Sequence, residues 1–224
     1  VKDEKLTPRI TETAKALWLT YLLFTVAAIA ALKLCGLSWL DSVCHAFSVM
    51  ALGGFSSRDA SISAFDTTAV EIVLSVFMVL ASVSFARHFV ALRTFSLKPY
   101  QRDTQGKAVL MVLGGSILLI AGLLTISGTY PDFMESLRHT TFNVISVATT
   151  TGFSSENYEL WPLFAPVWML FLSCILCSTG STGGGIKMFR TLLLWRQAAR
   201  EFKQLVHPSA VIPIRIGGNV VPDR

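Results

Sequence analysis

Charged residues and cysteines are scarce in this sequence. Asp, Glu, Lys and Arg make up 15% of the 224 residues, whereas a soluble domain carries about 25%. The four cysteines are too few for a disulfide framework, and Cys174-x-x-Cys177 lacks the second pair that a metal site needs. We interpret both residues as small packing residues of a membrane helix. No nucleophile, general base or metal cluster converges in the sequence, so we expect neither an enzyme nor a cofactor in this chain.

Apolar residues replace the missing charge. They make up 52% of the chain, and the mean hydropathy is +0.57. A helix needs roughly 20 residues to cross about 30 Å of hydrocarbon, and four apolar runs approach that length. These are residues 14–34, 67–90, 108–127 and 161–176, and the last continues past a break as 186–195. The sequence therefore predicts an all-α integral membrane protein in which each run crosses once.

Positive charge is concentrated on one side of this arrangement. Lysines and arginines gather in residues 1–15, 87–107 and 187–224. Only Lys33, Arg58 and Arg138 lie elsewhere. Because cytoplasmic loops are enriched in Lys and Arg, we expect both chain ends in the cytoplasm and the intervening loops outside. This distribution accounts for the net charge of +5 without a nucleic-acid partner, which we do not expect.

One segment occurs twice. Residues 45–57 align with residues 143–155, and both copies contain Gly-Phe-Ser-Ser. A repeat of about a hundred residues is too long for a solenoid, whose units span roughly 20–50 residues, so we interpret it as a duplicated module. The helices expected before the loops, at 38–50 and 134–147, are too short to cross, since the first reaches only about 18 Å. Each module is therefore predicted as a helix, a re-entrant pore loop and a second helix.

The two re-entrant loops have the composition of a cation filter. Non-helical backbone is tolerated at membrane depth only where it is buried in protein or lines a watery cavity. Glycine permits the backbone alternation that turns consecutive carbonyls to one side, and carbonyl rings coordinate a dehydrated alkali cation. Neither loop contains the carboxylate usual in divalent-cation sites. A tight outer turn is the alternative interpretation. The candidate filter residues are Ala51, Leu52, Gly53, Gly54, Phe55, Thr149, Thr150, Thr151, Gly152 and Phe153.

A glycine-rich segment interrupts the last apolar run. Residues 177–187 read Cys-Ser-Thr-Gly-Ser-Thr-Gly-Gly-Gly-Ile-Lys, which fails as a phosphate-binding loop because Lys187 comes one place too late. A glycine-interrupted span indicates an ion pathway, since unwound backbone must face a cavity. We expect the Lys187 ammonium to extend to the cytoplasm or, alternatively, to form part of a barrier. The candidate gate residues are Gly180, Ser181, Thr182, Gly183, Gly184, Gly185 and Lys187.

Two further charged features have less specific interpretations. Residues 189–206 are expected to form a basic amphipathic helix, which suits contact with anionic membrane lipid or with a cytoplasmic partner. Glu71 lies one turn inside the second apolar run, where we expect it to pair internally or to reach the interface.

Three motifs in the chain are specific enough to indicate a family. They are Gly-Gly-Phe-Ser-Ser-Arg-Asp-Ala-Ser at 53–61, Thr-Thr-Thr-Gly-Phe-Ser at 149–154 and Gly-Ser-Thr-Gly-Gly-Gly-Ile-Lys at 180–187. Together they resemble the bacterial TrkH/KtrB potassium-uptake family, over essentially the whole chain. That family is similar in plan to four fused copies of a potassium-channel unit, and this chain looks like the second and third copies.

The resemblance implies a role for each motif. Gly54 and Gly152 would be filter glycines, and residues 180–185 would be an intramembrane gating loop. The resemblance also implies a homodimer in the bacterial inner membrane, regulated by a cytoplasmic TrkA-like ring that binds the regulatory nucleotide. Potassium would be held by the backbone carbonyls of Leu52, Gly53, Gly54, Thr150, Thr151 and Gly152.

The expected organisation has four parts. They are a pore repeat at 1–93, a cytoplasmic link at 94–107, a pore repeat with a broken second helix at 108–206 and a cytoplasmic tail at 207–224. Because two filter loops cannot encircle an ion, we expect a fragment of a full transporter subunit. The sequence is compatible with both symport and channel-like flux. One alternative is a secondary cation transporter that binds its coupling ion at the broken helix. Another is a non-transporting membrane scaffold that docks through residues 189–206.

Overall fold

The computed structural model describes residues 10–65, 67–101, 103–207, 213, 215–216 and 219–220. The first half contains α1 (Ile10–Leu34), α2 (Trp39–Ala51), the 3-10 helix η1 (Ser61–Phe65), α3 (Thr68–Ser82) and α4 (Phe85–Thr94). The second half contains α5 (Lys98–Gln101), α6 (Thr104–Ile126), α7 (Phe133–Ala148), η2 (Tyr158–Leu160), α8 (Phe164–Ile175) and α9 (Met188–Val206). A short antiparallel pairing of β1 (Arg215–Ile216) with β2 (Asn219–Val220) follows. The first nine residues and most of the expected cytoplasmic tail lie outside the described residues.

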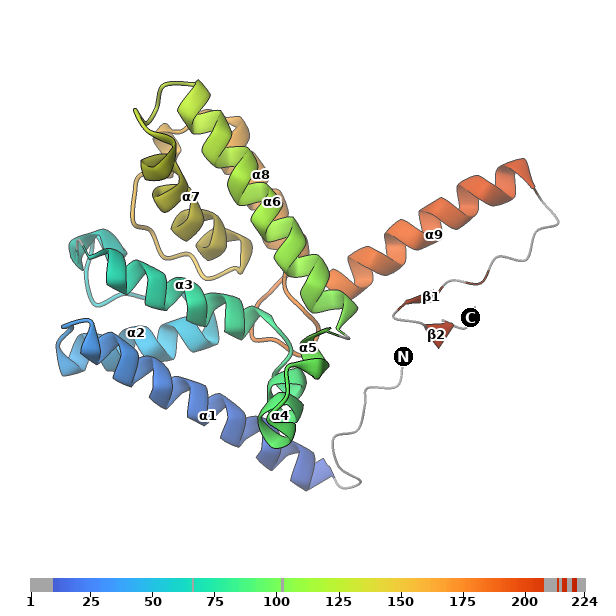
Figure 1. Ribbon diagram of the computed structural model, residues 1–224, viewed down its shortest axis with the longest axis horizontal. Helices are drawn as coiled ribbons and strands as arrows, with labels where there is room; N and C mark the ends of the chain where they lie inside the picture. The colour runs from blue at the N-terminus through green and yellow to red at the C-terminus, as the bar shows by residue number, and fades with distance from the viewer. Residues whose placement is uncertain are drawn as a thin grey trace.

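The helices form two modules with the same plan, side by side (Figure 1). In the first module α1, α2 and α3 pack against one another, and in the second α7 packs against α6 and α8. The modules meet where α3 contacts α7. Each module thus consists of a long helix, a short helix, a loop and a returning helix, which confirms the predicted duplication.

The short helices are the most buried elements of the bundle. Ala46, Val49 and Met50 of α2 are fully buried, as are Val144 and Ala148 of α7. The long helix α1 instead exposes much of its apolar surface, including Leu19, Leu22, Leu23 and Val26. An apolar exterior around a packed interior is the pattern of a helical membrane protein.

Two helices among the described residues are long and apolar enough to cross a membrane alone, namely α1 over Thr11–Leu34 and α6. The prediction that residues 67–90 form one crossing helix is wrong. The run breaks after Ser82, and α3 and α4 meet at an angle of 100°. Val83 is extended, the Ser82 carbonyl accepts a hydrogen bond from the Ser178 amide at 3.0 Å, and the Phe85 amide donates to the Gly180 carbonyl at 3.0 Å. The helix therefore ends because its backbone bonds to the glycine-rich segment instead.

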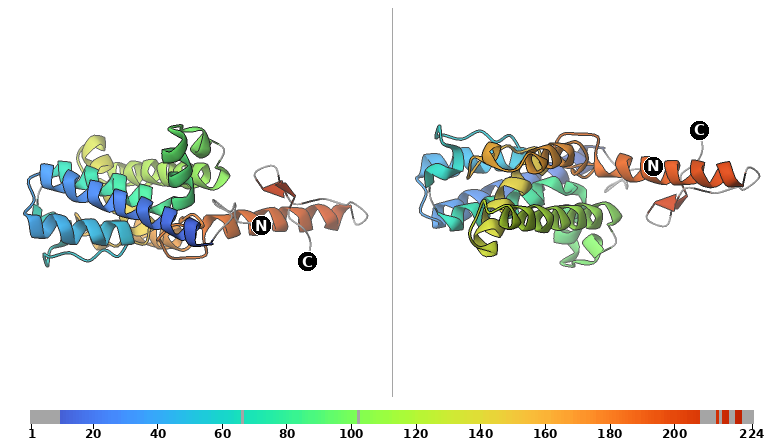
Figure 2. Two further views of the ribbon diagram at one scale, coloured as in Figure 1. Left: turned by 90° about the horizontal axis from the view of Figure 1, so that it is seen from below. Right: turned by 90° about the horizontal axis from the view of Figure 1, so that it is seen from above.

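The last apolar run is also divided. Helix α8 begins at Phe164 and spans 12 residues, and the glycine-rich segment separates it from α9. Helix α9 extends away from the bundle (Figures 1 and 2), and Met188 is its buried residue. The returning helices of both modules are thus interrupted, although only the second interruption was marked by glycines.

An ion pair joins the two modules. Arg138 on α7 donates from Nε to Glu71 Oε2 at 3.1 Å and from Nη2 to Oε1 at 3.3 Å. The Glu71 side chain is 11% exposed and that of Arg138 is 39% exposed. Of the two predicted placements for Glu71, internal pairing is therefore the one observed.

We expect Glu71→Gln to weaken the contact between α3 and α7, because it removes the charge while keeping the side-chain volume. The expected loss of stability is about 1 kcal/mol or less, since the arginine is well exposed to solvent and such pairs are screened. Thermal unfolding in detergent, followed by tryptophan fluorescence, measures the effect. Glu135→Gln alters an exposed carboxylate on α7 and serves as the control. Equal melting temperatures for the two variants would contradict a stabilising role for this pair.

Candidate ion pathway

The two re-entrant loops contact each other. A Cβ built on Gly54 would collide with the Thr151 carbonyl oxygen and would lie 3.1 Å from the Gly152 carbonyl carbon. Further out, the Ile62 amide donates to the Ser154 carbonyl at 3.0 Å, and the Ser154 amide donates to Ser61 Oγ at 3.2 Å. The fold therefore brings segments that are about a hundred residues apart into direct backbone contact.

Both loops have the same alternating backbone. Leu52 and Gly54 have φ angles of 53° and 67°, and their counterparts Thr150 and Gly152 have φ angles of 64° and 90°. A left-handed residue thus occurs at every second position, as a row of inward carbonyls requires. Ala51, which was expected in the first loop, is instead the last residue of α2.

Leu52 and Thr150, the residues with a side chain at positive φ in the two loops, terminate the short helices. The Leu52 amide donates to Val49 O at 3.2 Å, and the Thr150 amide donates to Val147 O at 3.0 Å. The following amides, of Gly53 and Thr151, each return to a serine carbonyl of the helix at 2.9 Å. These are the bonds of a left-handed helix cap. They offset a conformational cost of about 1–2 kcal/mol for a residue with a Cβ.

Equivalent side chains brace the outer arm of each loop. His45 Nε2 hydrogen-bonds to Ser56 Oγ at 2.9 Å, and its counterpart Asn143 donates from Nδ2 to Ser155 Oγ, one position further along the second loop, at 3.1 Å. Ser146 Oγ donates to the Phe153 carbonyl at 2.6 Å. The hydroxyls of Thr149 and Thr151 hydrogen-bond to each other at 2.8 Å and so brace the second loop internally.

A buried carboxylate fixes the outer end of the first loop. Asp41 accepts hydrogen bonds from Ser57 Oγ at 2.5 Å, Ser38 Oγ at 2.8 Å and Arg58 Nη2 at 3.1 Å. These donors, with Ser57 first, lower the pKa of the Asp41 carboxyl to about 2. Ser38 caps the start of α2, because its Oγ accepts a hydrogen bond from the Asp41 amide at 3.0 Å while its hydroxyl donates to the Asp41 carboxylate.

The glycine-rich segment lies against the inner ends of both loops. Thr182 Oγ1 donates to the Met50 carbonyl at 2.9 Å, and the Gly184 amide donates to Thr150 Oγ1 at 2.9 Å. The Cys177 thiol donates to the Thr149 carbonyl at 3.4 Å. A side chain at Gly183 would collide with Cys177 Sγ, so this close approach requires glycine. The segment therefore lies directly against the ends of both loops where they leave the short helices.

The same segment is also attached to α3, α4 and α6. Its bonds to Ser82 and Phe85 hold the break between α3 and α4, and the Thr179 amide donates to Gln105 Oε1 at 3.1 Å, at the start of α6. The prediction that Lys187 extends to the cytoplasm is wrong. Its backbone φ of 75° turns the side chain back, and Nζ donates to the Gly183 carbonyl.

Two residues of this region were missed or misread in the sequence. Cys177 was interpreted together with Cys174 as helix packing, but it lies beyond α8 in the glycine-rich segment. Gln105 was not considered at all, because nothing in its sequence context indicates that Thr179 lies beside it. In the sequence, the feature that pointed to the true position of Cys177 was its place next to the glycine-rich residues.

Apolar helices and two abutting re-entrant loops with an unwound segment beneath them define an all-α membrane transporter fold. The family described as "TrkH: Cation transport protein" matches residues 1–224. The chain belongs to the TrkH family.

Known relatives agree with this assignment. The Trk system potassium uptake protein TrkH of Halomonas elongata is 44% identical over all of this chain and 46% of its own length. The corresponding TrkH of Escherichia coli K12 is 40% identical, again over 46% of its length. The crystal structure of the potassium transporter TrkH from Vibrio parahaemolyticus superposes with a TM-score of 0.92 at 41% identity, covering 96% of this chain and 47% of that one. The chain thus spans about half the length of the relatives it matches.

Alanine substitutions at Gly36, Gly152 and Gly54 distinguish the cost of backbone strain at positive φ from the cost of a steric collision. Gly36 and Gly152 have φ angles of +94° and +90°, and an added Cβ meets nothing within 4 Å at either. We expect Gly36→Ala and Gly152→Ala each to cost about 1–2 kcal/mol. Gly54→Ala should cost clearly more, because the Thr151 carbonyl must move and the loops must separate. Unfolding of the three variants in detergent tests this order, and equal losses would contradict it.

Proposed function

We propose that this chain supplies two of the four pore loops of a potassium-selective uptake pore. Potassium would bind the backbone carbonyls of Leu52, Gly53, Gly54, Thr150, Thr151 and Gly152. The observation that carries the proposal is the matching left-handed alternation in two loops that abut each other. The names of the relatives, Trk system potassium uptake proteins, support the choice of ion. A transport role also agrees with the expectation that the chain is not an enzyme.

Electrostatics support a monovalent cation at this place. Both short helices end at the loops, so their partly negative C-terminal ends point toward the ion path. The loops themselves contribute neutral carbonyls and no carboxylate. Carbonyl oxygens replace the hydration shell of potassium without burying net charge.

The glycine-rich segment is the proposed gate. It contacts both loops from below, and its hydrogen bonds to α3, α4 and α6 hold it in place. Lys187 places its ammonium on the Gly183 carbonyl, which puts a fixed positive charge beside the exit of the path. Displacement of the segment would remove both the backbone and this charge from the path.

Several observations disfavour a coupling-ion site within the broken helix itself. The Gly180 carbonyl is taken by the Phe85 amide, the Ser178 carbonyl by Ser181 Oγ and the Gly183 carbonyl by Lys187. These oxygens are already bonded to protein donors, one of which is a cation. A secondary transporter that binds its ion there is therefore the weaker alternative.

The membrane orientation and partners form part of the same proposal. The start of α1, helices α4 and α5 and the start of α9 lie at one end of the bundle (Figures 1 and 2). These segments carry a cluster of basic residues, namely Lys15, Arg87, Arg93, Lys98 and Arg190, so this end would face the cytoplasm of a bacterial inner membrane. A TrkA-like nucleotide-binding ring would act on this face, and two subunits would form a homodimer, as the family resemblance implies.

Uptake of rubidium against sodium into liposomes tests the filter. With the complete transporter subunit carrying this sequence, we expect rubidium-selective uptake, and we expect Gly152→Ser to reduce the selectivity because the loop backbone can no longer hold its φ of +90°. Gly36→Ser is the matched control, with the same strain and the same open space but outside the loops. Selectivity that survives Gly152→Ser, or falls equally in the control, would overturn the filter proposal.

A variant that weakens the attachment of the glycine-rich segment tests its proposed role as a gate. Gln105→Ala removes one hydrogen bond to Thr179 and is expected to raise the rubidium uptake rate by up to roughly fivefold, if a bond worth about 1 kcal/mol is made only in the closed state. The rubidium-to-sodium ratio should stay unchanged, because the loops are untouched. Gln101→Ala, at an exposed residue of α5, is the control. A change in selectivity, or no change in rate, would contradict the gating role.

A further inference from the structure

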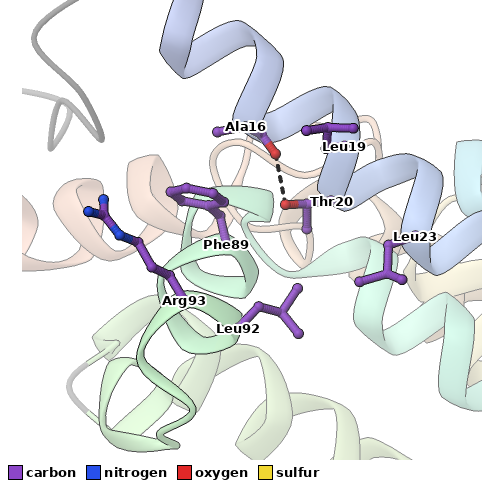
Figure 3. A pocket seen from close by; sticks show the side chains of 7 residues that line it. All are labelled: Ala16, Leu19, Thr20, Leu23, Phe89, Leu92 and Arg93. Atoms are coloured by element: carbon purple, nitrogen blue, oxygen red, sulfur yellow. Dashed lines mark hydrogen bonds between the residues drawn. The ribbon is translucent and has the colours of Figure 1, made fainter.

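An apolar groove lies between the membrane-spanning helix α1 and the turned helix α4. It has a volume of about 380 Å³, within the range of roughly 300–1,000 Å³ that ligand sites occupy. Figure 3 shows its lining side chains facing one another across the gap between the two helices. The lining residues are Ala16, Leu19, Thr20, Leu23, Phe89, Leu92 and Arg93.

The groove exists because of the 100° break between α3 and α4. Helix α3 packs along α1. After the break, α4 runs in a different direction and also contacts α1, which leaves a corner between α1 and α4. Because α1 is long and apolar enough to cross a membrane, lipid would surround the apolar surface of this corner. Leu19 and Leu23 are more than half exposed there.

The polarity of the groove changes along its length. Arg93 lies at the end near Ala16, whereas Leu23 lies at the other end, deeper along α1 (Figure 3). The one hydroxyl in the lining, of Thr20, donates to the Ala16 carbonyl at 2.8 Å and so requires no ligand. The exposed Trp18 is on the same part of α1, as is typical of the membrane interface. A cation at the interface and apolar surface beyond it match the two ends of a phospholipid.

We propose that this groove binds an anionic diacyl phospholipid. The lipid phosphate contacts the Arg93 guanidinium, and an acyl chain lies against Leu19, Leu23 and Leu92. Lys15, exposed one residue before Ala16, adds positive charge at the same end and favours an anionic over a zwitterionic head group.

Native mass spectrometry of the complete transporter tests the proposal. The detergent-solubilised protein is mixed with equimolar palmitoyl-oleoyl phosphatidylglycerol and palmitoyl-oleoyl phosphatidylcholine, and the retained lipids are counted. We expect a preference for phosphatidylglycerol that falls roughly fivefold in Arg93→Ala, the effect of one cation at a membrane surface. Arg190→Ala, an equal loss of charge on α9, should retain the preference, and Arg93→Lys should retain most of it.

A second variant tests the apolar part of the groove independently of charge. Leu92→Trp fills the groove and should reduce the retention of phosphatidylglycerol, whereas Leu194→Trp, at an exposed position of α9, should not. Equal retention of the two lipids, or equal losses in Arg93→Ala and Arg190→Ala, would overturn the proposal. So would a change of oligomeric state in Leu92→Trp with lipid retention intact, because the occupant would then be protein.

Discussion

Backbone amides and carbonyls inside a membrane need hydrogen-bond partners within the protein, and the rest of this structure depends on how that requirement is met. Helical bonding stops at the inner ends of α2 and α7 and again at the ends of α3 and α8. The two short helices are closed by their own left-handed caps. The glycine-rich segment supplies partners at the end of α3 and lies directly against the other three ends. It fits this position because two of its closest approaches are made by glycines: a Cβ at Gly183 would collide with a thiol, and one at Gly185 would lie 2.6 Å from the Cys174 carbonyl oxygen.

This arrangement links the two modules more closely than their interface alone would. The ion pair between Glu71 and Arg138 joins them near the outer side, the loops meet backbone to backbone, and the glycine-rich segment bonds to both on the inner side. The duplicated modules are nevertheless not interchangeable. Gly54 is enclosed by the neighbouring loop, whereas Gly152 has open space beside it, so the same residue is required for contact in one loop and for conformation alone in the other.

Local features of this fold could be predicted from the sequence, and features that depend on distant partners could not. The repeated Gly-Phe-Ser-Ser motif located both loops, and the short helix expected at 38–50 is observed as α2. The bend at residues 82–84 contains neither glycine nor proline, and its cause lies in amides and carbonyls far along the chain. Lys187 was expected to follow its charge toward water. Instead its ammonium donates to the carbonyl of the buried Gly183.

The bend between α3 and α4 has a consequence for how the protein is made. The partners of the Ser82 carbonyl and the Phe85 amide are translated roughly a hundred residues after them, a delay of about 5–20 s at ordinary rates of synthesis. Until then the first module carries unbonded polar backbone at the membrane, or remains a straight helix that must later break. The hydrogen bonds that hold the bend can therefore form only after residues 178–180 have been made.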